Sequence, residues 1–308
     1  MYPKKTKKES CYTMKGLPWV QSLLNIRQIL EESKNSPLRH GKPFVTVGDI
    51  STQFYCEAKV ELMYKLGRVE TEPMREGIET HERLLKMKKV NLQQIVQEIN
   101  KGLPCLIRIL LVSKVEDLLV AGFPDEIGFL AGKPRFLAEL KTFGVGSFRL
   151  YSSHAVQAKM YALLLDKMGF DCSKLVLSVV GLRRGTDIDR KVLNRTLFSL
   201  VLLPSFHHLS GTVYVSKSKL DMINEKVLRL FRLNKPEVEK VKGLVEAGDL
   251  SVFCLPYQRE EALKDLRWAK GYWLGLREPK PTQSLAKCRG CVYREECKYR
   301  PRLDSFLS

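Results

Sequence analysis

The periodicity of the apolar residues changes once along the chain, near residue 103, and this change limits the fold more than any other feature. Before it, apolar residues recur at helical spacing, with Ser51 and Pro73 as expected helix starts. After it, short runs rich in β-branched residues predict strands, and Ala131-Gly132-Lys133-Pro134 predicts a hairpin turn. This order of elements predicts an α/β fold with a mixed central sheet flanked by helices. The expected helices cover residues 51–66, 74–85, 90–100 and 153–168, and the expected strands cover residues 105–112, 117–130, 135–142 and 175–180.

The segment that follows this core has a weaker pattern. It holds a basic stretch from Arg183 to Arg195, a strand candidate at Thr212–Val215 and three helical stretches over 218–232, 235–247 and 257–276. We therefore expect a mostly helical insertion. The expected divisions are a basic tail and lead-in over 1–44, a core over 45–181, the insertion over 182–283 and a cysteine-rich end over 284–308.

The charge balance indicates a polyanionic partner. The 308 residues include 52 Lys and Arg against 34 Asp and Glu, which gives a formal net charge of +18. Each nucleic-acid phosphate that such a protein neutralises releases condensed counterions, and this release favours binding. The sequence holds no apolar run of membrane-spanning length, and its basic N-terminus lacks the apolar core of a signal peptide. We therefore expect an intracellular protein, cytoplasmic or associated with nucleoid or nucleus, without a membrane partner.

Two acidic residues and a lysine are expected to meet on one face of the hairpin. Side chains alternate along a strand, so Glu139 and Lys141 share a face while Leu140 points to the other. A hairpin centred on Gly132 places Asp125 opposite Glu139, about 5 Å away at Cβ, where like charges repel. A bound Mg²⁺ or Mn²⁺ would remove that repulsion, because both ions prefer oxygen ligands. Such a metal can activate water for phosphodiester hydrolysis while Lys141 stabilises the transition state. The alternative is a surface hairpin with an ordinary Glu–Lys pair.

Two expected helices carry further polar side chains. His154, Gln157 and Tyr161 lie at helical spacing on one face of the helix that follows Lys141. That face can hydrogen-bond to a nucleotide or stack on it, or it is the polar edge of an ordinary amphipathic helix. His81 lies on the apolar stripe of the helix expected over 74–85, either as a metal ligand or as a hydrogen-bonded core histidine.

The cysteines near the end of the chain predict a metal centre. Cys288, Cys291 and Cys297 form the pattern C-x2-C-x5-C, and Gly290 allows a tight turn between the first two. Thiols this close together in an intracellular protein indicate a bound metal rather than a disulfide framework. The spacing does not distinguish an iron–sulfur cluster from zinc, and no histidine follows His208 to supply a fourth ligand. The remaining candidates for that ligand are Cys11, Cys56, Cys105, Cys172 and Cys254.

The ordered set of these residues resembles the PD-(D/E)XK nucleases of the RecB type. The set is His81, Gly-x-Pro-Asp125, Glu139-x-Lys141 and Gln157-x-x-x-Tyr161. One upstream cysteine and three near the C-terminus resemble the iron–sulfur subgroup, which includes the CRISPR-associated RecB-like nucleases, the AddB nuclease domain and the exonuclease V family. The resemblance covers about residues 45–180 and 284–300. It implies a restriction-endonuclease-like core with a C-terminal iron–sulfur module.

The resemblance also implies roles for single residues. His81, Asp125 and Glu139 would bind Mg²⁺ or Mn²⁺, joined by the Leu140 carbonyl, and Lys141 would be the catalytic lysine. The residues implied for substrate binding are Gln157, Tyr161 and His154. The residues implied as ligands of a [4Fe–4S] cluster, which would staple the two ends of the core together, are Cys56, Cys288, Cys291 and Cys297.

We therefore expect a metal-dependent DNA nuclease that hydrolyses phosphodiester bonds, acting as a single-strand-preferring exonuclease in repair or end processing. The long segment before the cysteines resembles the exonuclease V arrangement, in which added helices enclose a passage for a single strand. The basic stretch from Arg183 to Arg195 would line that passage. One alternative is a CRISPR adaptation nuclease that trims spacer precursors beside an integrase, whereas an exonuclease would work beside a helicase. The other is a non-catalytic nucleic-acid-binding module stapled by a cluster or by zinc.

Overall fold

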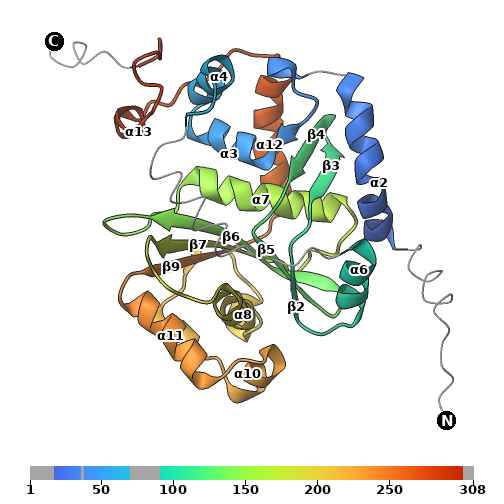
Figure 1. Ribbon diagram of the computed structural model, residues 1–308, viewed down its shortest axis with the longest axis vertical. Helices are drawn as coiled ribbons and strands as arrows, with labels where there is room; N and C mark the ends of the chain where they lie inside the picture. Colours follow the sequence, from blue (N-terminus) through green and yellow to red (C-terminus); the bar gives the residue numbers. More distant parts are fainter. Residues whose placement is uncertain (1–16, 36–37, 70–90, 301–308) are drawn as a thin grey trace.

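Two β-sheets organise the chain. The structure is a computed structural model that describes residues 17–35, 38–69 and 91–300. A six-stranded sheet has the order β2-β5-β6-β7-β9-β8, and a three-stranded sheet has the order β1-β4-β3 (Figure 1). The strands are β1 (Val45–Thr46), β2 (Cys105–Ile107), β3 (Leu111–Val115), β4 (Leu118–Gly122), β5 (Glu126–Leu130), β6 (Lys133–Phe143), β7 (Val176–Arg183), β8 (Val213–Tyr214) and β9 (Leu250–Pro256).

Helices cover the six-stranded sheet on both faces. α7 lies across one face together with α3 and α12, and α8, α10 and α11 lie on the other (Figure 1). The helices are α2 (Pro18–Glu32), α3 (Val47–Tyr55), α4 (Glu57–Leu66), α6 (Leu92–Asn100), α7 (Ser152–Lys167), α8 (Arg190–Val201), α9 (Lys217–Leu220), α10 (Glu225–Phe231), α11 (Lys235–Glu246), α12 (Arg259–Trp273) and α13 (Leu285–Arg289). The expected α/β class, with mixed sheets flanked by helices, is confirmed.

The centre of the six-stranded sheet is a parallel pair, β6 and β7, connected by the crossover helix α7. A parallel strand that is covered on both faces needs apolar side chains on both faces. β7 meets this need with the sequence VLSVVGLR, which is buried along all but its last residue. The other pairings in this sheet are antiparallel. α7 is thereby fixed over the strand that carries the predicted catalytic residues.

The β5–β6 hairpin reaches its register through a turn and a bulge. Ala131 and Gly132 form the two-residue turn with φ of 51° and 76°, as a type I′ turn requires. The register then shifts by one, which leaves Arg135 of β6 without an opposite residue on β5. Glu126, the first residue of β5, pairs with Ala138. Asp125, the residue before it, therefore stands beside Glu139. Asp125 and Glu139 are therefore neighbours, as expected. The turn is centred between Ala131 and Gly132 instead of on Gly132, and the bulge compensates for this difference in register.

The helix expected over 51–66 is broken into two. Thr46, rather than Ser51, caps α3, because Thr46 and Asp49 form a reciprocal capping box. Cys56 adopts an extended backbone with φ of −171°, which ends α3, and α4 begins at Glu57. The expected start of this helix was therefore wrong, and Cys56 occupies the break between two helices.

Two of the expected strands also divide. The run 117–130 separates at residues 123–125 into β4 and β5, which belong to different sheets. Pro124 lies at this break, where it has no amide hydrogen to donate to a ladder. The run 105–112 separates in the same way at Arg108–Leu110. Asp125 and Arg108 thus both lie where the chain passes from one sheet to the other.

The segment 182–283 is less helical than expected. β9 pairs with β7 along its length, and β8, close to the candidate at Thr212–Val215, pairs with β9. The expectation missed β9, although its sequence LSVFCLP is the short apolar run typical of a buried strand. α12 packs in the same hydrophobic cluster as α7, so this segment builds part of the sheet and part of its cover.

Some expectations fall outside the described residues. The tail over 1–16, the helix expected over 74–85 and His81 on it are among them. Within the described residues, none of the helices is both long and apolar enough to cross a membrane.

Candidate functional site

Asp125, Glu139 and Lys141 come together at the end of the β5–β6 hairpin. The Asp125 carboxylate is buried and accepts a hydrogen bond from the backbone N–H of Leu140 at 2.7 Å. Lys141 Nζ lies 2.9 Å from Glu139 Oε1, and Glu139 is only 3% exposed. The predicted trio therefore forms one partly buried polar cluster, in which the main chain of β6 orients Asp125.

α7 contributes the residues that hold this cluster. Gln157 accepts a hydrogen bond from Lys141 Nζ at 2.8 Å and donates one to Glu139 Oε1 at 2.6 Å. It also lies 3.5 Å from the hydroxyl of Tyr161, one turn further along the helix. Both side chains are buried. Because α7 crosses directly over β6, the helical spacing of Gln157 and Tyr161 places both over the same acidic residue.

His154, the third predicted member of this helix face, has a different environment. Its ring stacks on Phe148 with centroids 5.6 Å apart and an interplanar angle of 4°. Its Nδ1 is buried and finds no partner among the described residues. Burial, and then the charge of Lys141, lower the pKa of His154 to about 4. The imidazole of His154 is therefore neutral at neutral pH.

Glu139 is an acid whose pKa is strongly raised in the folded protein. Burial raises the pKa of its carboxyl to about 7, against the opposing effect of Lys141, and the charge of Asp125 raises it further. Two carboxylates are thus held close together in a poorly solvated place. Among the described residues, no three His, Cys, Asp or Glu side chains are grouped as ligands of one metal ion, and His81 lies outside them.

Three residues of this site were not anticipated as a group. Arg190 of α8 donates from Nη2 to the main-chain oxygen of Asp125 and lies 3.2 Å from the carboxylate of Glu126. Asn194, one helical turn later, donates to the same carboxylate at 2.9 Å. The i, i+4 spacing of Arg190 and Asn194 was the available signal, but Arg190 was grouped with the basic stretch around it. Arg190 thus ties α8 to the Asp125 backbone.

A second arginine near the site, Arg108, lies in the connection between β2 and β3, where the chain passes from one sheet to the other. Arg108 follows β2, is half-buried, and places its guanidinium 4.3 Å from the ring centroid of Phe123. Its Nε has no hydrogen-bond partner among the described residues. Its charge acts on Glu126 and Glu139, lowering the pKa of each against the dominant effect of burial. Sequence reasoning missed it because it lies within an expected strand.

The four predicted cluster ligands line one pocket. Cys56 meets Cys288, Cys291 and Cys297 around a small cavity of about 20 Å³. Of the other candidates, Cys105 is half-buried against the main-chain oxygen of Glu98, and Cys11 lies outside the described residues. The remaining two, Cys172 and Cys254, are buried in the hydrophobic clusters on either side of the sheet. The structure therefore brings Cys56, and none of these three described alternatives, to the C-terminal thiols.

Cations and an amide donor surround this pocket, while burial and the neighbouring thiols raise the pKa of Cys288. The backbone N–H of Thr282 donates to Cys56 Sγ at 3.4 Å. Lys59 and Lys287 lie 5.0 Å and 4.8 Å from the ring centroid of Tyr55, and Arg294 also lines the pocket. Amide donors and nearby cations both stabilise thiolates, which are the form in which cysteine binds metals.

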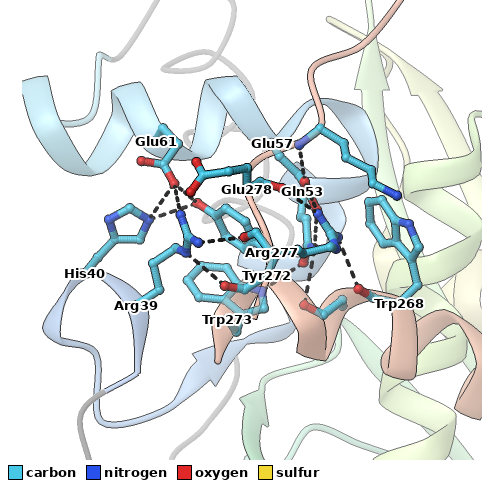
Figure 2. Close-up of polar contacts among 12 residues, drawn as sticks. Arg39, His40, Gln53, Glu57, Glu61, Trp268, Tyr272, Trp273, Arg277 and Glu278 are labelled. Carbon is cyan, nitrogen blue, oxygen red and sulfur yellow. Dashed lines mark hydrogen bonds and ion pairs between the residues drawn. The ribbon is translucent and has the colours of Figure 1, made fainter. Parts of the chain in front are cut away.

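A buried polar network joins α3 and α4 to the end of α12 and the residues that follow it (Figure 2). Glu57, the residue after Cys56, is fully buried and accepts two hydrogen bonds of 2.6 Å from Arg277. Gln53 donates to Glu57 at 2.7 Å and accepts from Trp273 at 2.8 Å. α3 and α4 are thereby held against the end of α12 and the segment that leads to the cysteines.

The outer half of this network uses residues before α3. Arg39 contacts Glu61 at 2.9 Å and donates to the main-chain oxygens of Tyr272 and Arg277 (Figure 2). His40 lies 2.8 Å from the hydroxyl of Tyr272, which also hydrogen-bonds to Glu61 at 3.0 Å. Charge pairs and hydrogen bonds therefore join the segment from Arg39 to Glu61 to the segment from Tyr272 to Arg277, independently of the thiols.

Comparisons with known proteins give a solved structure of low similarity. The chain is similar to the crystal structure of SSO0001 at 12% sequence identity, with a TM-score of 0.40, over 90% of this chain and 97% of that chain. No protein-family model matches the chain. No curated protein matches it.

The perturbed ionisation of Glu139 predicts a pH dependence of stability. Its folded pKa of about 7 lies above its ordinary value of 4.5, so the native state holds the proton more tightly than the unfolded chain. That stabilisation is present at low pH and is lost as the pH rises through about 7, a change of about 3 kcal/mol. Urea unfolding in EDTA at pH values of about 5 and about 8 should therefore show a smaller change for Glu139→Gln than for the wild type. The exposed Glu260→Gln should behave like the wild type, and an unchanged pH dependence in Glu139→Gln would contradict the assignment.

The Glu57–Arg277 pair predicts a large cost when one partner is lost. Arg277→Met leaves a fully buried carboxylate without its cation and should lower the free energy of unfolding by about 3–5 kcal/mol. Combining it with Glu57→Gln removes both charges and should recover much of that loss. Equilibrium urea unfolding of the two variants measures both values. Equal destabilisation of the single and the double variant would show that the ion pair is not the source of the cost.

Proposed function

We propose that this protein is a metal-dependent nuclease that hydrolyses phosphodiester bonds in DNA, preferring single strands and acting from an end. The observation that carries the proposal is the hydrogen-bonded cluster of Glu139, Lys141 and Gln157 beside Asp125. Burying two carboxylates and an amine costs free energy unless they are paired, and it gains no stability over apolar residues of similar size. A buried group of this kind with a strongly shifted pKa is typical of a catalytic site.

The acids fit a divalent cation. The charge of Asp125 raises the pKa of Glu139, and Mg²⁺ or Mn²⁺ between the two side chains would offset this repulsion with the oxygen ligands that these ions prefer. Asp125, Glu139 and the Leu140 carbonyl would hold the ion, with His81 as a further ligand from outside the described residues. When bound, such an ion supplies Lewis-acid stabilisation of the phosphate and lowers the pKa of a water.

The chain's own residues would orient the reacting groups. Glu139 and Gln157 both accept hydrogen bonds from Lys141, which fixes the ammonium where it can donate to a phosphate oxygen. The Leu140 N–H and the Arg190 guanidinium hold the side chain and main chain of Asp125. Arg108, beside Phe123, adds a cation within range of the acids. This placement removes the entropy cost of arranging the catalytic groups during each reaction.

We further propose that the cysteine pocket binds a [4Fe–4S] cluster. The support is that thiols from both chain ends share one pocket, with an amide donor at 3.4 Å from Cys56 and several cations around it. Zinc is the rival, and it would require all sulfurs about 2.3 Å from a single ion. The cluster would fasten the junction already held by Glu57 and Arg277, so its role would be structural.

The nuclease proposal predicts loss of cleavage without loss of fold. Asp125→Ala and Lys141→Ala should each lower the rate of Mn²⁺-dependent degradation of end-labelled single-stranded DNA by about 100-fold or more. The far-ultraviolet circular dichroism of both should remain that of the wild type. Lys174→Ala, an exposed lysine before β7, is the matched control and should cleave normally. Binding of DNA without cleavage of any strand by the wild type would instead favour a non-catalytic binding module.

The cluster proposal predicts a coloured protein. Protein purified without oxygen should be brown, with broad absorbance near about 400 nm and about four iron atoms per chain. Cys56→Ser and Cys291→Ser should each lose most of this absorbance, whereas Cys105→Ser, which lies away from the pocket, should keep it. Stoichiometric zinc with no iron, measured by elemental analysis, would contradict the cluster proposal and indicate a zinc site.

A further inference from the structure

A polar groove lies along the edge strand β2 on the face of the six-stranded sheet that α8 covers, opposite the face covered by α7. It has a volume of about 720 Å³ and lies between the chain around β2 and the helices α8 and α10. Its cations come from three separate parts of the chain: Lys101 before β2, Lys191 and Arg195 on α8, and Arg229 and Arg232 at the end of α10. No single basic run in the sequence corresponds to it.

Most of these cations form no ion pair with an acid in the part of the chain that the structure describes. Lys101 pairs with Glu98, but no ion pair among the described residues engages Lys191, Arg195, Arg229 or Arg232. Lys191, Arg229 and Arg232 are exposed, and Arg195 is half-buried. Cations that converge on one concavity repel one another, and a polyanion in the groove would relieve that repulsion.

The members of the predicted basic stretch separate in the structure. Arg183 pairs with Asp249 at 2.5 Å, and Arg190 is buried against Glu126. Neither of them lines the groove. Lys191 and Arg195 are the members of the stretch that reach it. Of this stretch, only these two residues can therefore contact a ligand in the groove that α8 and α10 share.

The groove begins directly behind the candidate catalytic site. Glu126 lines it, and Asp125, the preceding residue, belongs to the catalytic cluster on the other face. Arg190 contacts both residues. From Glu126 the groove follows β2 back to Leu103, so a strand that leaves the catalytic cluster around the sheet edge can continue along it.

We propose that this groove binds the phosphodiester backbone of the single strand of nucleic acid whose end occupies the catalytic site. The inference rests on the proposed nuclease function and adds to it the surface that holds the strand away from the reacting phosphate. Unpaired cations suit successive phosphates. Leu103 and Leu230 are 56% and 43% exposed on the groove's lining and offer apolar contact to sugars and bases.

The test separates the groove from the catalytic cluster by measuring binding without cleavage. The variant combines Lys191→Gln, Arg229→Gln and Arg232→Asn. Arg232 has a left-handed backbone with φ of 53°, which asparagine tolerates well, so the change should not strain the fold. Fluorescence anisotropy in EDTA would follow labelled single strands of about 4 and about 20 nucleotides over a range of salt.

Loss of three cations should weaken binding of the longer strand at least 10-fold and make its slope of log affinity against log salt shallower by about two. Binding of the shorter strand should change less, because it does not reach along the groove. The control combines Lys226→Gln, Lys240→Gln and Lys264→Gln, which removes the same charge from exposed lysines outside the groove and should leave the salt slope nearly unchanged.

Two outcomes would overturn the proposal. The first is the same loss of affinity and slope in both triple variants, since binding would then follow net charge and not the groove. The second is tight binding of polyglutamate that single-stranded DNA does not displace. That result would make the groove a docking surface for an acidic protein. Mn²⁺-dependent cleavage by the wild type is measured separately, so failure of the groove proposal would not be mistaken for failure of the nuclease proposal.

Discussion

The register of β5 against β6 is the constraint on which the candidate site depends. A strand displaced by one residue turns every later side chain to the other face. The bulge at Arg135 makes that one-residue correction after a two-residue turn at Ala131 and Gly132. Because of it, Glu139 and Lys141 face α7 and Asp125 stands beside them. A local irregularity in the ladder thus decides whether the acidic residues meet.

Helices pack on both faces of that hairpin and contribute different polar residues to each face. On one face, α7 supplies Gln157, which bonds to both Lys141 and Glu139. On the other face, α8 supplies Arg190, which holds Glu126 and the main chain of Asp125. The parallel pairing of β6 with β7 makes this possible, since it requires a crossover and so places α7 over β6. The proposed strand-binding groove lies on the α8 face, and the candidate catalytic cluster lies on the α7 face.

Two neighbouring sets of contacts join the region around α4 to the segment after α12. The Glu57–Arg277 pair and its hydrogen bonds hold α4 to the segment after α12 (Figure 2). The break at Cys56 brings a thiol from the same place towards Cys288, Cys291 and Cys297. A buried carboxylate needs its cation, so the network specifies the position of these two segments closely. We infer that it prepares the pocket in which the thiols would receive a cluster.

The sequence by itself determined the α/β class, the positions of most helices, the sharing of one strand face by Glu139 and Lys141, and the helical alignment of Gln157 with Tyr161. These depend on local periodicity, which a single chain segment contains. It did not determine β9, the division of the runs at Arg108 and at Pro124, or the choice of Cys56 among the candidate thiols. Only the tertiary structure decided those, and it also separated Arg190 from the basic stretch and gathered the groove's cations from three elements. The physical reason is that pairing partners, helix breaks and charge clusters depend on contacts between residues far apart in the chain, whose energies no local pattern records.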